Sequence, residues 1–492
     1  MIAFTVILLA VVEVLDITIV SVALLNMKGS LGASPNQITW TITVYVVTAA
    51  ICMPLVGLLS KQFGRRNLLL FSALGFGGAS FLCGLATNLT AMIIFRGLQG
   101  VFGALLPALA QSTLLETFPG KEANKAMALF GVGIMLGPIL GPILGGVIVD
   151  HMGWRWIFYI NIPICLLASV LTYKYIKQPK LSKQKIDWIG LGLLASGVGS
   201  LQYILDKGNE VNWFSSNIIV VSTTFSVLTL FLFIYRGMSQ QNNVINFALF
   251  KDKNFIISSV VMLLFCGILL GTMSWLPLWL EIFMHYPATT VGLVLIPRGL
   301  FCLLAMMFSP LLLKFIDGRL LIVIASICYI LGCLLSAHFD LLQGEYTIFW
   351  PNSLKGIACG LFFVPITGLA YQTVHKRDID GASGLLNFGR SLGGSIGVAI
   401  FSTVMSQETQ VNWHVLVQHL NPFNPAYYRY LEAHHLSKAM PDLHARLGIL
   451  ISNQANMIAF NDANYLFAFL SVLIIPLTFC LHKSKGQALM AH

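Results

Sequence analysis

The stretch "VVEVLDITIVSVALL", from Val11 to Leu25, places two carboxylates, Glu13 and Asp16, inside an otherwise apolar run. An apolar run of about 20 residues is long enough to cross the roughly 30 Å of hydrocarbon in a bilayer. A charged side chain at that depth is costly, and it usually serves a function or pairs with a charge of opposite sign. The stretch therefore predicts a transmembrane helix that carries a functional group.

Long apolar runs recur along the whole chain. Hydrophobic residues make up 57% of the 492 residues and charged residues only 10%, which excludes an ordinary soluble globular protein. We predict an all-α integral membrane protein with 14 transmembrane helices. The predicted spans are Phe4–Leu25, Ile38–Leu59, Leu68–Ala86, Ala91–Leu115, Lys125–Val149, Trp156–Ile176, Ile186–Leu205, Asn217–Tyr235, Phe255–Leu280, Ala288–Leu313, Leu320–Ala337, Thr347–Thr373, Ala382–Met405 and Ala463–Leu481.

The distribution of Lys and Arg predicts the orientation of these spans. The first run follows Met1 without a basic leader or a small-residue cleavage site, so we interpret it as a retained helix. With the N-terminus inside, most of the 29 Lys and Arg residues fall in inner loops, as expected for cytoplasmic loops. Both termini are therefore predicted to be cytoplasmic. The net charge of +10 follows from this bias and from attraction to anionic lipid, and requires no nucleic-acid partner.

The loops divide the chain into two six-helix bundles joined by an inserted helix pair. We assign residues 1–177 to the first bundle and 178–253 to a basic linker with the inserted helices 7 and 8. Residues 254–482 form the second bundle, with a long outer loop at 406–462, and 483–492 form a cytoplasmic tail. Two-bundle transporters of this kind bind cargo at the midplane between their halves.

Metal and cofactor chemistry find little support in the sequence. All nine cysteines lie inside apolar runs, which gives no disulfide framework and no zinc spacing. No G-x-x-x-x-G-K-[ST] phosphate loop occurs, which disfavours an ATP-driven pump. We predict no enzyme, no cofactor and no metal; a membrane-embedded enzyme is the least supported alternative. The histidines of the outer loop, which match no ligand motif, are His414, His419, His434, His435 and His444.

The acids of the first run are candidates for a proton site. Glu13 and Asp16 are three residues apart, so they share a helix face close to the bilayer centre. Desolvation and mutual repulsion favour the protonated form of at least one acid, whereas a nearby arginine favours the charged form. The fourth run, "FRGLQG", supplies Arg96 at hydrocarbon depth. We predict a proton site formed by Asp16, Glu13 and Arg96; the alternative is that Asp16 only holds helices together by pairing with an arginine.

The fifth run, "GVGIMLGPILGPILGG", repeats glycine every four positions. This spacing aligns the glycines on one helix face, which forms a groove for close packing of another helix. Two prolines one turn apart weaken the helix's own hydrogen bonds and favour a bend. A generic packing face is the alternative for the glycines. The residues concerned are Gly133, Gly137, Pro138, Gly141, Pro142, Gly145 and Gly146.

Other polar residues are less informative. Arg298, Lys355 and Arg390 fall near predicted helix ends, where snorkelling to the interface is a sufficient account. A cavity for apolar cargo needs aromatic and aliphatic lining with a few polar groups. The candidates for that lining are Tyr45, Gln99, Gln111 and Trp275.

These motifs together resemble the major facilitator superfamily, specifically its 14-helix drug:proton antiporters of the EmrB/QacA type. The resemblance is carried by "LDITIVSVAL", "GLLSKQFGRR", "FRGLQG" and "GPILGPILGG" followed by "GWRWIFYINIP", with weaker echoes in the second half. In this superfamily the fifth-helix motif marks proton-driven exporters. The resemblance also implies a cytoplasmic gating loop, with a counterpart in "KFIDGR". Its residues here are Gly57, Gly64, Arg65, Arg66, Asp317 and Arg319.

The resemblance implies a proton-driven secondary exporter of drugs or organic solutes that works by alternating access in the bacterial cytoplasmic (inner) membrane. Its cargo would be a small lipophilic or cationic organic molecule. Pumps of this type work with a periplasmic adaptor protein and an outer-membrane channel, so these partners are implied as well. A proton-coupled importer, or an exporter of one metabolite or metallophore, is the alternative.

The sequence departs from the family pattern at several positions. Lys61 replaces the usual acid of the inner-loop motif, so the charge latch that the family builds from that acid cannot be carried over. Glu13 stands where a glutamine is common, and Ser21 and Leu25 replace the usual asparagine and proline. A second titratable group beside Asp16 predicts an altered proton stoichiometry.

Overall fold

The computed structural model describes residues 1–118, 121–178, 187–239, 243–341, 344–420 and 443–482, together with 425, 429 and 432. Within these residues all regular secondary structure is helical, which confirms the predicted all-α fold class. Each predicted span coincides with one helix or with consecutive stacked helices. In the described part of the chain, 12 helices are long and apolar enough to cross a membrane.

The first bundle is built from six long helical segments, some of them broken by proline or glycine. Pro54 lies in the 3-10 turn between two segments of the second helix, where its lack of a backbone N–H interrupts the helical hydrogen bonds. Gly64, with a φ of 77°, separates the second helix from the third. The elements are α1 (Ile2–Ser30), α2 (Pro35–Ile38), α3 (Trp40–Cys52), η1 (Met53–Leu55), α4 (Val56–Phe63), α5 (Arg65–Leu85), α6 (Leu89–Gly103), α7 (Leu105–Thr117), α8 (Lys121–Met152), α9 (Trp156–Tyr159) and α10 (Asn161–Tyr175).

The inserted pair consists of α11 (Trp188–Lys207) and α12 (Asn217–Ser239), joined by η2 (Asn209–Val211) and η3 (Trp213–Ser215). Asp187 caps α11 by accepting a hydrogen bond from the Gly190 backbone N–H over 3.1 Å. Its Oδ1 also lies 2.9 Å from Nη2 of Arg236 in α12, and the hydrogen bonds from Arg236 hold the pKa of Asp187 below its usual range. One carboxylate therefore ties the two inserted helices together at one end.

The second bundle repeats the order of the first. Its first five helices are single long elements, and its sixth is a stack of two. The elements are η4 (Phe247–Lys251), α13 (Lys253–Ile282), α14 (Ala288–Leu312), α15 (Gly318–Ser336), α16 (Glu345–Tyr371), η5 (Lys376–Asp378), α17 (Ile379–Gln418), α19 (Leu443–Val472) and α20 (Ile474–Phe479).

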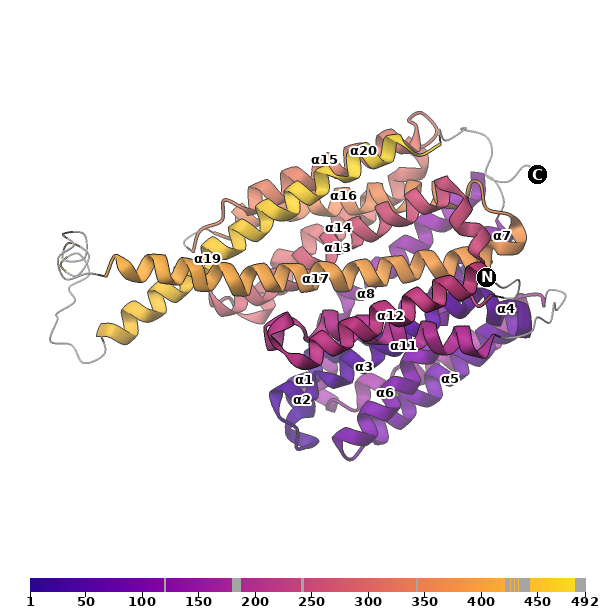
Figure 1. The fold of residues 1–492 in the computed structure, drawn as a ribbon, viewed down its shortest axis with the longest axis horizontal. Helices are drawn as coiled ribbons and strands as arrows, with labels where there is room; N and C mark the ends of the chain where they lie inside the picture. The colour runs from indigo at the N-terminus through magenta and orange to yellow at the C-terminus, as the bar shows by residue number, and fades with distance from the viewer. Residues whose placement is uncertain are drawn as a thin grey trace.

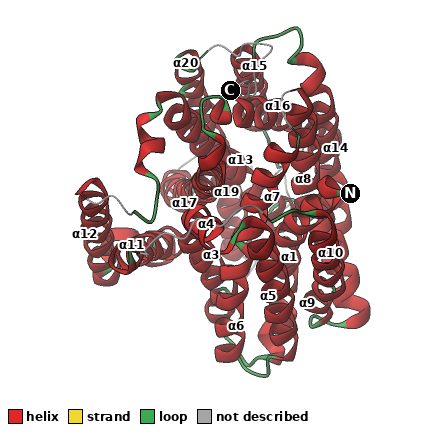
Figure 2. Cartoon of the chain, turned by 90° about the vertical axis from the view of Figure 1, so that its right-hand side faces the viewer, coloured by secondary structure: helices red, strands yellow, loops and turns green. Residues whose placement is uncertain are grey.

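Equivalent helices pack in equivalent ways in the two bundles. The first helix lies against the fifth in each, α1 against α8 and α13 against α17. The bundles meet where α8 packs on α14 and where α17 packs on α4 and η1. The inserted pair lies at the periphery, with α11 beside α3 and α17 (Figure 2). The interface between bundles is therefore lined by α4, α7 and α8 on one side and by α14, α16 and α17 on the other.

Two helices extend beyond the others at one end of the molecule. α17 continues to Gln418 and α19 begins at Leu443, so much of the segment predicted as an outer loop, 406–462, is helical (Figure 1). His434 and His435 of that segment lie outside the described residues. The tail at 483–492 lies outside them as well.

Candidate functional site

A cluster of buried polar side chains surrounds Asp16 in the middle of α1. Its Oδ2 lies 2.6 Å from Nη1 of Arg96 in α6, and the side chains of both residues are fully buried. Its Oδ1 accepts hydrogen bonds from Nε2 of Gln99 over 2.9 Å and from Nδ2 of Asn161 over 2.7 Å. The structure thus brings Asp16 and Arg96 together as the sequence predicts, with α1, α6 and α10 meeting at one carboxylate.

Arg96 is held from several directions besides Asp16. Its Nη1 also donates to Oε1 of Gln99 over 2.6 Å, and its Nε donates to the carbonyl oxygen of Thr41 over 3.1 Å. Its guanidinium carbon lies 4.4 Å from the centre of the Tyr45 ring. A buried ion pair offsets its desolvation cost only when further hydrogen bonds satisfy both partners. The surroundings of Arg96 supply such partners, although its Nη2 has none among the described residues.

Two members of this cluster are absent from the sequence-based prediction. Ser80 in α5 accepts from Nε2 of Gln99 over 2.7 Å and from Nδ2 of Asn161 over 3.4 Å. Both Ser80 and Asn161 are polar residues inside apolar runs, and Asn161 also lies in the stretch "GWRWIFYINIP". Gln99, predicted to line a cargo cavity, belongs to this cluster, and the Tyr45 ring, predicted to line it as well, packs against Arg96. We call Asp16, Ser80, Arg96, Gln99 and Asn161 the Asp16 cluster.

Glu13 lies apart from the Asp16 cluster. It is buried, at 4% exposure, and forms no hydrogen bond or ion pair with the described residues. The charges that act on it are those of Arg390 in α17 and of Asp16. Glu13 therefore lies within electrostatic range of the second bundle, whereas Asp16 is bonded only within the first.

A small cavity of about 30 Å³, which we call the central cavity, lies between the bundles. Gln111 of α7 and Asn387 of α17 meet at its wall, where Nδ2 of Asn387 donates to Oε1 of Gln111 over 2.7 Å. Trp275 lies elsewhere and donates to Ser402 within the second bundle. The cavity is large enough for a water molecule. Its other lining residues include Phe130, Met262, Met306, Phe363 and Arg390.

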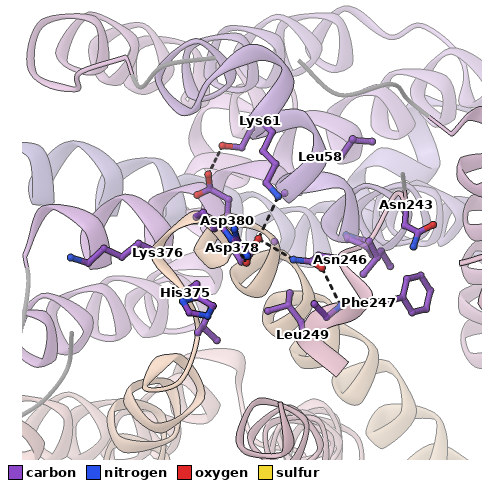
Figure 3. A pocket seen from close by; sticks show the side chains of 18 of the residues that line it. Leu58, Lys61, Asn243, Asn246, Phe247, Leu249, His375, Lys376, Asp378 and Asp380 are labelled. Atoms are coloured by element: carbon purple, nitrogen blue, oxygen red, sulfur yellow. Dashed lines mark hydrogen bonds and ion pairs between the residues drawn. The ribbon is translucent and has the colours of Figure 1, made fainter. Parts of the chain in front are cut away.

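The inner-loop motif lines a second cavity of about 870 Å³ at the predicted cytoplasmic face (Figure 3). Nη2 of Arg65 lies 2.8 Å from Oδ1 of Asp380, and Nζ of Lys61 lies 3.4 Å from Oδ1 of Asp378. Asn246, in the segment after the inserted pair, donates to the same Oδ1 of Asp378 over 2.9 Å. We call Lys61, Arg65, Asp378 and Asp380 the charge latch, because it joins the first bundle to the second.

The distribution of charges in the charge latch gives Lys61 a partner of opposite sign, Asp378. Both cations lie on the first bundle and both acids on the second, and Ser60 of α4 also hydrogen-bonds to Asp380. Arg65 pairs in addition with Glu116 of its own bundle. A latch therefore exists without the acid that the family motif usually places at position 61.

The remaining residues of the predicted gating loop have different surroundings. A Cβ added to Gly57 would lie 2.6 Å from the Cα of Gly381, so the backbones of α4 and α17 nearly touch there. The guanidinium carbon of Arg66 lies 5.4 Å from the centre of the Tyr173 ring within the first bundle. Asp317 and Arg319 pair over 3.3 Å within the second bundle and take no part in the charge latch.

The glycine motif of α8 packs on α1 around Asp16. A Cβ added to Gly137 would lie 2.6 Å from Cγ1 of Val14, and one added to Gly141 would collide with the side chain of Thr18. Oγ1 of Thr18 donates to the carbonyl oxygen of Gly137 over 3.2 Å. The motif thus fixes the stretch of α1 on both sides of Asp16. α8 itself continues through positions 138 and 142 as a single helix.

The same face of α8 continues in both directions. A Cβ added to Gly133 would lie 2.5 Å from Cγ2 of Ile7, and one added to Gly145 would lie 3.4 Å from Cα of Ile19. Gly146, in contrast, has nothing within 4 Å of an added Cβ. Gly146 is therefore outside the packing face.

The expectation that Arg298 and Lys355 snorkel to the interface is wrong. Their exposures are 7% and 2%, and both lie well inside their helices, α14 and α16. Neighbouring helices supply polar partners at that depth, so the side chains have no need to reach the interface. Arg390 is half-buried and lines the central cavity.

Comparison with known proteins gives consistent matches over most of the chain. A family model described as Major Facilitator Superfamily matches residues 6–398. Multidrug export protein EmrB of Haemophilus influenzae is 36% identical over 475 residues, which is 94% of this chain and 92% of the relative. Fatty acid resistance protein FarB of Neisseria gonorrhoeae is 32% identical over 473 residues, with the same coverage of 94% and 92%.

Among solved structures, the fold is similar to that of the human organic anion transporter MFSD10 (TETRAN). The TM-score is 0.61 at 13% sequence identity, and the match covers 96% of this chain and 98% of the other. At this identity the likeness concerns the fold alone.

Reversing the charge of Lys61 tests the charge latch. In Lys61→Glu a carboxylate faces Asp378, which removes an attraction of up to about 1 kcal/mol and adds a repulsion. We expect the ends of α4 and α17 to separate in a larger fraction of molecules. Spin labels at Phe63 and Lys376, in a protein without the exposed Cys480, measure this distance.

The swapped pair is the control for that experiment. Lys61→Glu combined with Asp378→Lys restores opposite charges and should restore the short distance. An unchanged distance distribution in Lys61→Glu alone would show that the ion pair does not hold the bundles together.

A methyl group on the packing face of α8 tests the contact with α1. Gly141→Ala forces its Cβ against Thr18, and such overpacking typically costs about 1–3 kcal/mol. We expect a lower midpoint of thermal unfolding in detergent. Gly146→Ala adds the same methyl group where nothing lies within 4 Å and should leave the midpoint unchanged. Equal midpoints for the two variants would contradict the packing.

Proposed function

Since the chain belongs to the major facilitator superfamily, we propose that this multi-pass membrane transporter is a proton-driven exporter of drugs or similar organic solutes. The observation that carries the proposal is the buried ion pair between Asp16 and Arg96. A protonatable group that is buried in a helix bundle and paired to a cation can link proton binding to helix position. The names of two relatives, a multidrug export protein and a fatty acid resistance protein, support export of organic compounds.

Asp16 is the proposed proton site, and Arg96 sets its affinity. Protonation at Oδ2 turns the carboxylate into a neutral acid and removes the attraction to Nη1 of Arg96. Arg96 then keeps its hydrogen bonds to Gln99 and to the carbonyl oxygen of Thr41. The hydrogen bonds from Gln99 and Asn161 to Oδ1 of Asp16 survive as well. Proton binding therefore loosens α1 from α6 without dismantling the Asp16 cluster.

Movement of α1 would reach the bundle interface through α8. The glycine face of α8 packs on the residues that flank Asp16, and α8 in turn packs on α14 of the second bundle. We propose that a proton bound from outside and released inside biases the equilibrium between the two bundle arrangements. Cargo in the shared cavity moves the opposite way.

The described conformation fits one stage of such a cycle. The charge latch is formed at the predicted cytoplasmic face, and the central cavity of about 30 Å³ is too small for an organic cargo. Opening the latch is the proposed step that admits cargo from the cytoplasm. Arg390, which lines this cavity, is proposed to respond to cargo together with the buried Glu13.

The lining of the central cavity favours lipophilic cargo. Three methionines, Met127, Met262 and Met306, and the rings of Phe130 and Phe363 form much of its wall. Methionine side chains are flexible and polarisable, so they adapt to ligands of different shape. Gln111 is the polar group of the first bundle in this wall.

We also propose 14 membrane crossings with both termini in the cytoplasm of a bacterial inner membrane. α8 and α17, with 32 and 40 residues, add two long helices to the 12 that meet the length and hydropathy requirements. The part of α17 and α19 that extends beyond the other helices is the proposed docking site for a periplasmic adaptor protein (Figure 1). An outer-membrane channel would complete that assembly.

Substrate-driven proton movement in inside-out vesicles tests the proposal. We expect lipophilic cations or weak acids to release protons from vesicles that carry the wild-type protein, and Asp16→Asn to abolish the release. Asp16→Asn leaves Arg96 without its counter-ion, which can cost about 3–5 kcal/mol of stability. The double variant Asp16→Asn with Arg96→Gln removes both charges, and should fold more stably but remain uncoupled.

Asp187→Asn is the matched control, because it removes an acid from an Asp–Arg pair that joins α11 to α12 and belongs to neither bundle. It should leave substrate-driven proton release unchanged. Normal coupling in a well-folded Asp16→Asn protein would show that the proton site lies elsewhere and that Asp16 is structural.

A further inference from the structure

The second bundle contains its own buried polar cluster, centred on Lys355 of α16. Nζ of Lys355 donates to Oγ of Ser336 over 2.9 Å and to Oδ1 of Asn464 over 3.2 Å. The residue is 2% exposed, and its two partners are 2% and 1% exposed. A lysine this deeply buried is rare unless it is paired or functional.

This cluster repeats the Asp16 cluster in the other bundle. Lys355 lies on the fourth helix of its bundle, as Arg96 does. In both bundles the sixth helix contributes an asparagine and the third helix contributes a serine. The corresponding pairs are Arg96 and Lys355, Asn161 and Asn464, and Ser80 and Ser336.

The repeat lacks the acid. The counterpart of α1 is α13, whose charged residues, Lys253 and Glu281, lie at its two ends. Where α1 presents the carboxylate of Asp16, α13 presents backbone carbonyl groups: Nη2 of Arg298 donates to the carbonyl oxygen of Leu269 over 3.2 Å. The second cluster therefore has a buried basic side chain, Lys355, without a counter-ion among the described residues.

The groups that face Lys355 do not supply a negative charge. Arg298 of α14 is the charged group that acts on it, and Tyr329 and Cys333 of α15 are neutral neighbours of this pair. Nη1 of Arg298 is itself buried without a partner among the described residues. Asp462 of α19 lies two residues before Asn464 and forms no ion pair with Lys355 in the described part of the chain.

The hydrogen bonds match a neutral amine. An ammonium group has three N–H donors, and Nζ of Lys355 has two acceptors within the described residues. A neutral amine has two N–H groups, so both are satisfied without a counter-ion. Burying the ammonium here, with Arg298 nearby and without a counter-ion among the described residues, would be strongly unfavourable.

We propose that Lys355 is a second proton-exchange site, in addition to the proton site proposed at Asp16. In the closed arrangement its Nζ has given a proton to water and is a neutral amine. When the second bundle rearranges and water from outside reaches the cluster, Nζ takes up a proton from that water and becomes an ammonium. It releases this proton to water on the cytoplasmic side before the closed arrangement forms again. This inference rests on the proposed proton coupling, and it adds one proton to each transport cycle.

Nuclear magnetic resonance of isotope-labelled lysine side chains tests the protonation directly. The Lys355 signal in the lipid-embedded protein is identified by its loss in Lys355→Met. We expect it to change from the ammonium to the neutral-amine position between mildly acidic and mildly alkaline pH. A signal that stays at either position over that range would overturn the proposal, whatever the outcome of the transport experiments.

Proton stoichiometry in vesicles provides the second test. Lys355→Met never binds a proton and Lys355→Arg never releases one, so both should move one proton fewer per cargo molecule than wild type. Lys207→Met is the matched control: Lys207 is also buried, at 6% exposure, but pairs with Glu210 over 2.8 Å. Its stoichiometry should equal that of wild type.

An unchanged stoichiometry in both Lys355 variants would overturn the second site. If the wild-type protein moves no protons at all, the proposed function fails, while the resonance of Lys355 still decides whether this lysine titrates.

Discussion

The ion pair between Asp16 and Arg96 determines how the first bundle is assembled. A carboxylate at the centre of a membrane helix must be paired, and here the partners come from three other helices, α5, α6 and α10, directly or through Ser80. α8 then covers the same stretch of α1 with a face of glycines, which allows the two backbones to approach closely. The fifth helix and the buried acid are thus two parts of one packing arrangement.

The two bundles share an architecture but differ in charge. The first contains a neutral pair, Asp16 with Arg96, whereas the second contains Arg298 and Lys355 without an acid in the described residues. At the predicted cytoplasmic face it is the second bundle that contributes acids. There the first bundle contributes the cations of the charge latch, and the second bundle contributes its carboxylates. Because charges of opposite sign meet at that face, relative motion of the bundles must break ion pairs there.

The sequence predicted well those features that depend on one helix or on depth in the membrane. The apolar runs gave the helices, and the cost of an acid and an arginine at hydrocarbon depth predicted that Asp16 and Arg96 meet. The neighbours of Glu13 were harder to predict. At 100° per residue, the three residues from Glu13 to Asp16 leave about 60° between the two side chains around the helix, which is enough to direct them toward different neighbours. Asp378 and Asp380 lie more than 300 residues from Lys61 and Arg65, and no local pattern shows that they pair. The polar partners of the buried Lys355 are Ser336 in α15 and Asn464 in α19. Only tertiary packing brings these two helices next to α16.

The central claim is that Asp16 exchanges a proton during transport. Infrared difference spectra between acidic and neutral pH detect a carboxyl group directly, because its acid and carboxylate forms absorb at different frequencies. The claim predicts a carboxylic-acid band in the lipid-embedded wild-type protein that is lost in Asp16→Asn and kept in Glu13→Gln. An identical band in wild type and Asp16→Asn would show that Asp16 stays ionised next to Arg96, and would contradict the claim.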